Sequence, residues 1–209
     1  MGSRIRLVAF DLDGTLTRGP TCLEAAATAY GFVDRLPGWQ RSRTEAETAA
    51  ARVQAWRELT ERSGAGVDQG RALAAVSLAS GAVEGVAALH GAGISTVIVS
   101  LAFAPHVAHF ARRLGVDSWI ATEPGVDGPF RHVFSRTKPT LLAGYVHRLG
   151  LTPDQVAAVG DTPGDLPMLR SVGTSVYVGP EPLAGFTPTL HLPAAAIDQL
   201  ARRLLDRPG

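Results

Sequence analysis

Two aspartates separated by one residue are the feature of this sequence best suited to chemistry. Asp11 and Asp13 follow the apolar run Ile5–Phe10, and Gly14 comes directly after them. Such a run predicts a buried strand, and carboxylates beside it are costly unless a cation or a proton balances their charge. Asp13-Gly14 alone would also suit a simple turn. We favour a metal-dependent reaction centre at the end of this strand.

A single lysine is the second informative feature. The chain holds 20 basic residues, and Lys138 is the only lysine among them. Lysine carries a compact point charge and arginine a planar fork of donors, so the two are not interchangeable where a point charge is needed. Pro139 follows, which also fits a lysine that merely begins a helix. We expect Lys138 to join the carboxylates.

Two further polar groups follow apolar runs. Ser100 closes the run Ile94–Ser100, and Asp161 follows Val156–Gly160, with Asp165 four residues later. In open α/β sheets, ligands bind at the carboxyl ends of the strands. We therefore predict that these side chains meet the aspartate pair and the lysine in space. A serine at a strand end is ordinary by itself, and Asp165 would also suit the cap of a following helix.

The elements that must position these groups alternate along most of the chain. Buried strands are expected at Ile5–Phe10, Ile94–Ser100, Val156–Gly160 and Ser175–Val178, with a short one at Trp119–Ala121. Helices are expected at Val83–His90, Pro105–Leu114, Thr140–Leu149, Asp165–Ser171 and Ala194–Leu205. This alternation predicts an α/β fold with a doubly wound, mostly parallel sheet. Gly125–Phe134, with Asp127-Gly128 in its middle, indicates an appended hairpin.

The segment from residue 18 to residue 80 interrupts this rhythm. It holds helical patterns at Leu23–Tyr30, Thr44–Glu61 and Gln69–Leu78 and no clear strand. Because it follows the first strand's loop directly, we expect an inserted α-helical cap over the carboxyl edge of the sheet. The predicted domains are a core of residues 1–17 and 81–209 and a cap of residues 18–80.

The composition argues against several classes of protein. A formal net charge of +1 does not favour binding to nucleic acid or to a membrane surface. The only cysteine, Cys22, rules out an internal disulfide and is expected to pack as a small apolar residue. No apolar run approaches the roughly 20 residues of a membrane span, and no signal peptide is recognisable, so we expect a cytoplasmic protein. His106 and His109 have the spacing of a metal-binding pair on a helix, but no third ligand is evident, so we expect them on a solvated helix face.

The order of these motifs resembles that of a known family. Asp-x-Asp-Gly-Thr from Asp11, then Ser100, then Lys138, then Gly-Asp-x-x-x-Asp from Gly160 resembles the haloacid dehalogenase superfamily, and in particular its phosphoserine-phosphatase-like branch. The resemblance implies a Rossmann-like core with an inserted cap and a Mg²⁺-dependent phosphatase activity. It also implies phosphate rather than carbon–halogen chemistry, because true dehalogenases of this family lack the aspartate at Asp13.

The resemblance gives each motif residue a role. Asp11 is expected to attack phosphorus and form an aspartyl-phosphate, which divides one difficult displacement into two easier ones. Asp13 would protonate the leaving alcohol and later deprotonate the attacking water. Lys138 would hold the phosphoryl oxygens, and Ser100 and Thr15 are expected to bind the phosphate as well.

The same resemblance implies a metal site. Mg²⁺ would be held by the Asp11 carboxylate, the Asp13 backbone carbonyl and Asp161, with waters and phosphate completing the coordination. Asp165 would orient a metal-bound water or Lys138 from behind these ligands.

The cap departs from the branch in ways that bear on the substrate. Where that branch places a glutamate for the substrate ammonium, this chain reads Gly19-Pro20-Thr21-Cys22. Arg57 is the cap arginine expected, from its distance before Ser100, to bind a substrate carboxylate. We expect a small phosphomonoester other than phosphoserine, with an alcohol, a sugar or a specialised metabolite as its organic part.

Two other functions remain open from the sequence. A phosphomutase or phosphotransferase would pass the phosphoryl group to a hydroxyl instead of water. A noncatalytic phosphometabolite-binding module would have no need of both Asp11 and Asp13. The sequence does not decide whether the chain forms a homo-oligomer.

Overall fold

A six-stranded sheet organises the computed structural model, which describes residues 4–206 apart from 42–43, 65, 126–128 and 195. The strands lie in the order β5-β4-β1-β6-β7-β8, and every neighbouring pair is parallel. Their bounds are β1 Leu7–Phe10, β4 Ser95–Phe103, β5 Ser118–Thr122, β6 Val156–Gly160, β7 Thr174–Val178 and β8 Leu190–Leu192. The predicted α/β fold class is confirmed.

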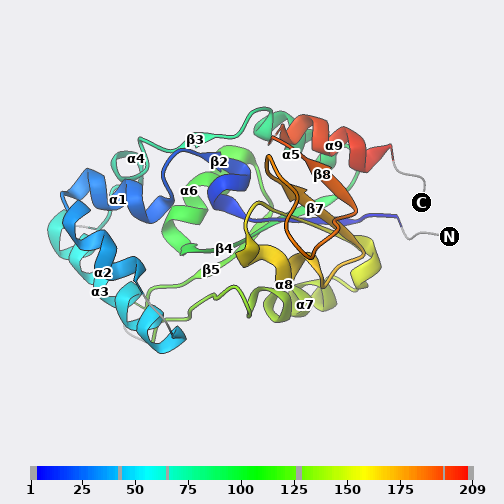
Figure 1. Ribbon diagram of the computed structural model, residues 1–209. Helices are drawn as coiled ribbons and strands as arrows, with labels where there is room; N and C mark the ends of the chain where they lie inside the picture. The colour runs from blue at the N-terminus through cyan, green and yellow to red at the C-terminus, as the bar shows by residue number, and fades with distance from the viewer. Residues whose placement is uncertain (1–3, 42–43, 65, 126–128, 195, 207–209) are drawn as a thin grey trace.

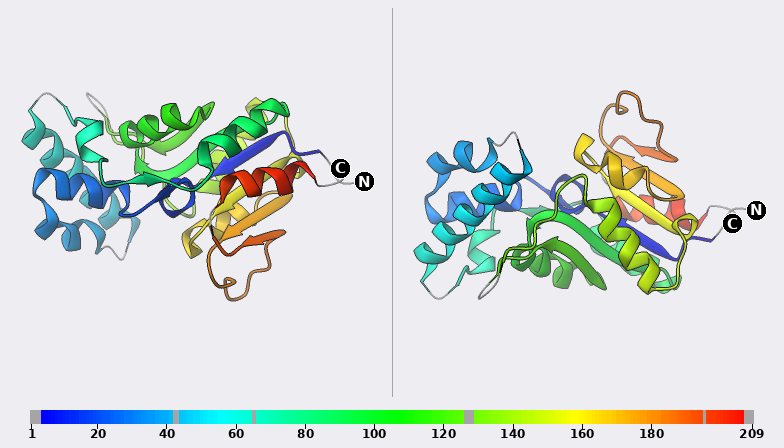
Figure 2. Two further views of the ribbon diagram at one scale, coloured as in Figure 1. Left: turned by 90° about the horizontal axis from the view of Figure 1, so that it is seen from above. Right: turned by 90° about the horizontal axis from the view of Figure 1, so that it is seen from below.

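Helices cover both faces of this sheet, as Figures 1 and 2 show. The helices on one face are α5 Ala82–Gly91, α6 Ala104–Leu114 and α9 Ile197–Leu205, and those on the other are α7 Lys138–Arg148 and α8 Leu166–Leu169. Because crossover helices occupy both faces, every central strand must be apolar along its whole length.

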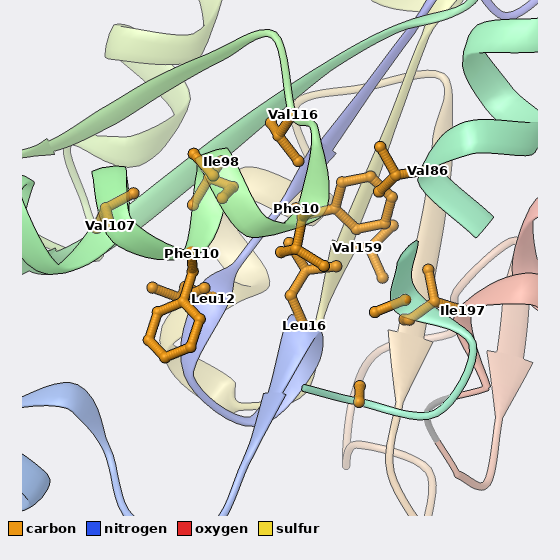
Figure 3. Packing of buried hydrophobic residues seen from close by; sticks show 14 of the residues in the cluster. Phe10, Leu12, Leu16, Val86, Ile98, Val107, Phe110, Val116, Val159 and Ile197 are labelled. Atoms are coloured by element: carbon orange, nitrogen blue, oxygen red, sulfur yellow. The ribbon is translucent and has the colours of Figure 1, made fainter. Parts of the chain in front are cut away.

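The residues of β1 show how the two layers are built. Val8 and Phe10 belong to the cluster under α5, α6 and α9, whereas Leu7 and Ala9 belong to the cluster under α7 and α8. All four are fully buried. Figure 3 shows the ring of Phe10 near Val86, a residue of α5. The alternation follows from the two-residue period of a strand and fixes the register of β1.

The segment after β1 forms helices at one end of the molecule (Figure 1). They are α1 Cys22–Tyr30, α2 Leu36–Gln40, α3 Glu45–Ser63 and α4 Gln69–Ala72. Thr21 and Thr44 precede α1 and α3 and form capping boxes. Each threonine hydroxyl accepts from the backbone N–H of the glutamate three residues later, and the carboxylate of that glutamate accepts from the threonine N–H. This confirms a helical insertion, while the division at residues 17/18 and 80/81 stays a prediction.

The predicted helix Gln69–Leu78 is wrong in its second half. α4 ends at Ala72, and β3 Ser77–Leu78 pairs antiparallel with β2 Thr17–Arg18. These two strands carry the chain out of the sheet and back, and pairing them satisfies backbone groups that would otherwise lack partners. The expectation that the insertion contains no strand fails for the same reason.

Three smaller differences concern the rest of the core. The predicted helix Asp165–Ser171 is shorter, because a 3-10 turn over Pro163–Asp165 precedes α8. β8 is an additional edge strand. An antiparallel bridge joins Glu123 to Arg131, but the predicted turn at Asp127-Gly128 lies outside the described residues.

Across the described residues, no helix combines the length and the apolarity that crossing a membrane requires.

One glycine allows α5 and α9 to pack closely. A Cβ added to Gly85 would lie 2.5 Å from the carbonyl oxygen of Ile197 and 2.9 Å from the backbone nitrogen of Asp198. Both contacts are with backbone, which cannot rotate away as a side chain can. Gly144, in α7, is exposed, and its nearest contact would be Arg148 Nη1 at 3.8 Å.

We predict that Gly85→Ala lowers the free energy of unfolding by about 1–3 kcal/mol, because the methyl group forces the two helices apart. Gly144→Ala is the matched control and should raise it by about 0.5–1 kcal/mol, since alanine is the better helix former. Urea denaturation of both variants checks the pair. Stabilisation by Gly85→Ala would contradict the packing described.

Candidate active site

The loop after β1 places the first carboxylates at the edge of the sheet. The Asp11 N–H donates to the Val159 carbonyl at 2.9 Å, so pairing with β6 continues one residue beyond β1. The chain then turns sharply through Leu12–Leu16, with Gly14 at φ +86°. A Cβ at Gly14 would collide with the Asp161 carboxylate, so glycine is required for the loop to approach Asp161.

Lys138 joins three elements of the core. It begins α7, is 1% exposed, and donates from Nζ to Asp11 Oδ1 at 2.6 Å and to Asp165 Oδ1 at 2.7 Å. The other oxygen of Asp165 accepts bonds from the Asp161 N–H and from the N–H and hydroxyl of Thr162 at 3.0–3.3 Å. Both Asp165 oxygens are therefore engaged, which suits a residue that orients the lysine.

Asp161 completes the cluster from the loop after β6. Its Oδ1 accepts the Thr15 hydroxyl at 2.9 Å. One carboxylate oxygen each from Asp11, Asp161 and Asp165 lie within 4.8 Å of one another. The structure thus brings together five of the residues that the sequence predicted, from both ends of the chain.

The charges in this cluster do not balance. Three carboxylates face one ammonium group, Lys138. Burial raises the pKa of Asp11, although the ion pair with Lys138 opposes the shift, and burial raises the pKa of Asp161 against the hydrogen bond from Thr15. Burial alone would lower the pKa of Lys138, but the neighbouring carboxylates of Asp11 and Asp165 raise it above its usual value. An oxygen-lined site with excess negative charge fits a hard divalent cation.

Asp13 and Ser100 lie at the same edge of the sheet. Asp13 Oδ1 accepts the Cys22 N–H at 3.0 Å, and burial raises the pKa of Asp13. Cys22 is buried as expected. Ser100 lies two residues beyond Ile98, the register partner of Phe10, and its Oγ accepts the Ala102 N–H at 3.1 Å. The strand register therefore puts Ser100 at the same edge as Asp11.

A pocket of about 150 Å³ lies between the cap helices and this edge. It is lined by Asp13, Thr21, Leu23, Arg52, Leu101, Ala102, Phe103 and His106. The walls are mainly apolar, with one carboxylate and one guanidinium. This pocket can hold the organic part of a small substrate beside the carboxylate cluster.

The cap arginine beside the pocket is Arg52 and not Arg57. Arg52 is partly buried, and its guanidinium donates to the Val133 carbonyl at 2.6 Å and lies over the Phe134 ring. Arg57 is exposed and lines a different, open hollow along α3. The geometry favours Arg52 over Arg57 for binding a substrate carboxylate. Arg52 shares the inward face of α3 with the buried Ala55, whereas Arg57 lies on the exposed face.

The expected solvated face of α6 is wrong for His106. This side chain is fully buried, and its Nδ1 lies 2.5 Å from Gln69 Oε1. His109, one turn later, is only partly buried. Neither Arg52 nor His106 is among the residues predicted for the site, and both line the pocket where the cap docks on the core.

Comparison with known proteins agrees with this geometry. The family model of haloacid dehalogenase-like hydrolases matches residues 8–170. A phosphoserine phosphatase of Halobacterium salinarum is 31% identical, with 96% of this chain and 97% of that protein covered. One from Albidiferax ferrireducens is 30% identical over 83% of this chain and 78% of that protein. A solved phospho-aspartyl intermediate analogue of phosphoserine phosphatase has the same fold, with a TM-score of 0.73, 18% identity, and coverage of 96% of this chain and 99% of that one.

We predict that Lys138→Met lowers the free energy of unfolding by about 3–5 kcal/mol, because it leaves Asp11 and Asp165 buried without a counter-charge. In the metal-free wild type, burial raises the pKa of Asp11 to about 8, and loss of the ammonium group raises it further. The deficit should therefore grow as the pH rises above about 8, where the wild type releases a proton that the folded variant still retains. Denaturation with a chelator present checks both points, and Arg136→Met, at an exposed position, is the control. A deficit independent of pH would contradict the ion-pair account.

Proposed function

Because this chain belongs to the haloacid dehalogenase-like hydrolases, we propose that it is a phosphatase that hydrolyses a small phosphomonoester through an aspartyl-phosphate. The observation that carries this proposal is the position of Asp11, which lies in the loop after a central strand, bonded to Lys138 inside a cluster of carboxylates. A buried carboxylate held by a fixed ammonium group is oriented for attack on an electrophile and partly relieved of repulsion from a phosphate.

The proposed reaction has two displacements. Lys138 binds Oδ1 of Asp11, and we assign Oδ2 as the oxygen that bonds to phosphorus. In the first displacement, the bond from Asp11 Oδ2 to phosphorus forms while the bond from phosphorus to the alcohol oxygen breaks. Asp13 donates the proton of its carboxyl group to that alcohol oxygen. A water then bonds to phosphorus, Asp13 takes its proton, and the bond between Asp11 and phosphorus breaks. The raised pKa of Asp13 is consistent with an acid that is protonated at the start.

We assign a divalent metal ion, Mg²⁺, to the carboxylate cluster. The Asp11 and Asp161 side chains and the Asp13 backbone carbonyl would hold it, and it would supply positive charge to the phosphoryl oxygens. Asp165 positions Lys138 and the loop from Asp161 to Thr162. Ser100 and Thr15 would donate hydrogen bonds to the phosphate.

The pocket limits the organic part of the substrate. About 150 Å³ beside Asp13 suits a chain of a few carbons, and Arg52 would attract an anionic group at its far end. The relatives' names point to phosphorylated amino acids or compounds of similar size. The single buried cysteine fits a reducing compartment, so we place the reaction in the cytoplasm.

We predict that Asp11→Asn reduces phosphate release by at least about 10⁴-fold while the protein stays folded, because an amide is a poor nucleophile at phosphorus. Phosphate release is measured from a panel of phosphorylated metabolites with Mg²⁺. The mass of acid-quenched wild-type protein, measured by mass spectrometry, shows whether a phosphoryl group is bound. Asp34→Asn, at an exposed position, is the control. Full activity of Asp11→Asn would contradict the covalent route, and transfer to an added alcohol without phosphate release would identify a phosphotransferase.

We also predict that Arg52→Gln lowers kcat/KM for 3-phosphoglycerate by about 10-fold or more, because the substrate carboxylate loses a charged donor. Arg57→Gln lies five positions further along the same helix and should change this value by less than about 2-fold. Steady-state kinetics of the two variants checks the choice of arginine. A larger loss of kcat/KM in Arg57→Gln than in Arg52→Gln would favour Arg57, the arginine predicted from the sequence.

A further inference from the structure

One acceptor atom beside the pocket has no role in the chemistry proposed above. His106 lies in the first turn of α6, is fully buried, and lines the pocket with Asp13 and Arg52. The rings of Trp56 and Phe103 meet its imidazole edge-on, with centroids 5.9 and 5.7 Å away. Trp56 belongs to the cap and Phe103 to the core, so the imidazole lies where the two parts meet.

Gln69 determines which nitrogen of His106 carries the proton. Gln69 Nε2 donates to the Val67 carbonyl at 2.8 Å, which turns its Oε1 toward His106. That oxygen lies 2.5 Å from Nδ1 of His106. A carbonyl oxygen can only accept, so Nδ1 is the protonated nitrogen and Nε2 keeps its lone pair.

The imidazole is also neutral. Burial, with a smaller contribution from the nearby His109, lowers the pKa of His106 to about 4. Nε2 is buried and has no hydrogen-bond partner among the described residues. An unpaired buried acceptor is destabilising, so it is usually paired in the state in which the protein works.

We infer that Nε2 of His106 accepts a hydrogen bond from a hydroxyl group on the organic part of the substrate, which makes His106 a specificity-determining residue. This inference rests on the proposed phosphatase function and narrows its substrate class to small phosphomonoesters with a hydroxyl group near the ester.

The charges around the pocket favour a hydroxyl over an ammonium group. A neutral imidazole does not offset the cost of removing an ammonium ion from water, and the Arg52 guanidinium repels a second cation. Glu24 is the nearest cap carboxylate in sequence to the pocket residue Leu23, but its two oxygens accept bonds from the Thr21 N–H and from Gln40. The remaining pocket carboxylate, Asp13, is assigned to proton transfer.

Three substrates that differ at one carbon test the inference. 3-Phosphoglycerate carries a hydroxyl at C2, O-phosphoserine an ammonium group, and 3-phosphooxypropanoate only hydrogen. For the wild-type enzyme with Mg²⁺, kcat/KM should be about 10-fold or more higher for the hydroxyl compound than for the other two. In His106→Phe, which retains an aromatic ring, the preference over 3-phosphooxypropanoate should fall to within about 2-fold, mainly through loss of activity on 3-phosphoglycerate.

Two further variants separate recognition from folding. His109→Phe, on the same helix, should keep the wild-type preference. Gln69→Leu removes the partner that fixes the protonated nitrogen and should reduce the preference even if His106→Phe does not fold. An unchanged preference in folded His106→Phe or folded Gln69→Leu, or a wild-type preference for O-phosphoserine, would overturn this inference but not the proposed function. Absence of phosphate release from every ester tested would overturn the proposed function with it.

Discussion

The structure of the site depends on one buried ammonium group placed between two carboxylates. Lys138 Nζ lies 2.6 Å from Asp11 and 2.7 Å from Asp165, and all three side chains are nearly inaccessible to water. Burying these charges is favourable only if each charged group has a close partner of opposite charge. The position of each of the three groups therefore constrains the other two. The Asp165 carboxylate is fixed in turn by Thr162 and by the Asp161 backbone. A planar guanidinium at position 138 would need more room, which explains a lysine in a chain otherwise rich in arginine.

The parallel sheet makes this meeting of distant residues unavoidable. β1 lies between β4 and β6, so the loops after these three strands emerge side by side. Both faces of β1 are buried, and a shift of one residue would move Phe10 and Ala9 to the wrong layers. The register that satisfies the core therefore also sets the distance between Asp11 and the loop that carries Asp161.

The parts of the molecule that the sequence predicted are those determined by strong local patterns. Continuous apolar runs identified five of the six strands of the main sheet, and charged residues after them identified the cluster around Lys138. The strands β2, β3 and β8 have only two or three residues, too few to show a period. The prediction of Arg57 rests only on its distance before Ser100. The buried residues of α3 are Ala55 and Leu59, and Arg52, three residues before Ala55, shares their helix face.

The prediction for His106 is wrong because a histidine on an amphipathic helix is normally solvated. Its burial results from contacts with Trp56 and with Gln69, which belong to the insertion and cannot be placed without the fold.

The two sides of the pocket divide the chemistry between them. In the proposed reaction, the core edge holds the groups that act on phosphorus, and most of these are charged because the phosphoryl group is charged throughout. The opposite side is proposed to meet only the organic part, where a charge such as the Arg52 guanidinium binds substrate and transition state equally and so favours binding rather than the chemical step. A neutral acceptor such as His106 selects by being satisfied or left unpaired, and rejection of the wrong partner by an unpaired buried atom is stronger than rejection by shape alone. A cap that lacks the glutamate of its relatives' branch can therefore still be selective, with its choice shifted from a cation to a hydroxyl.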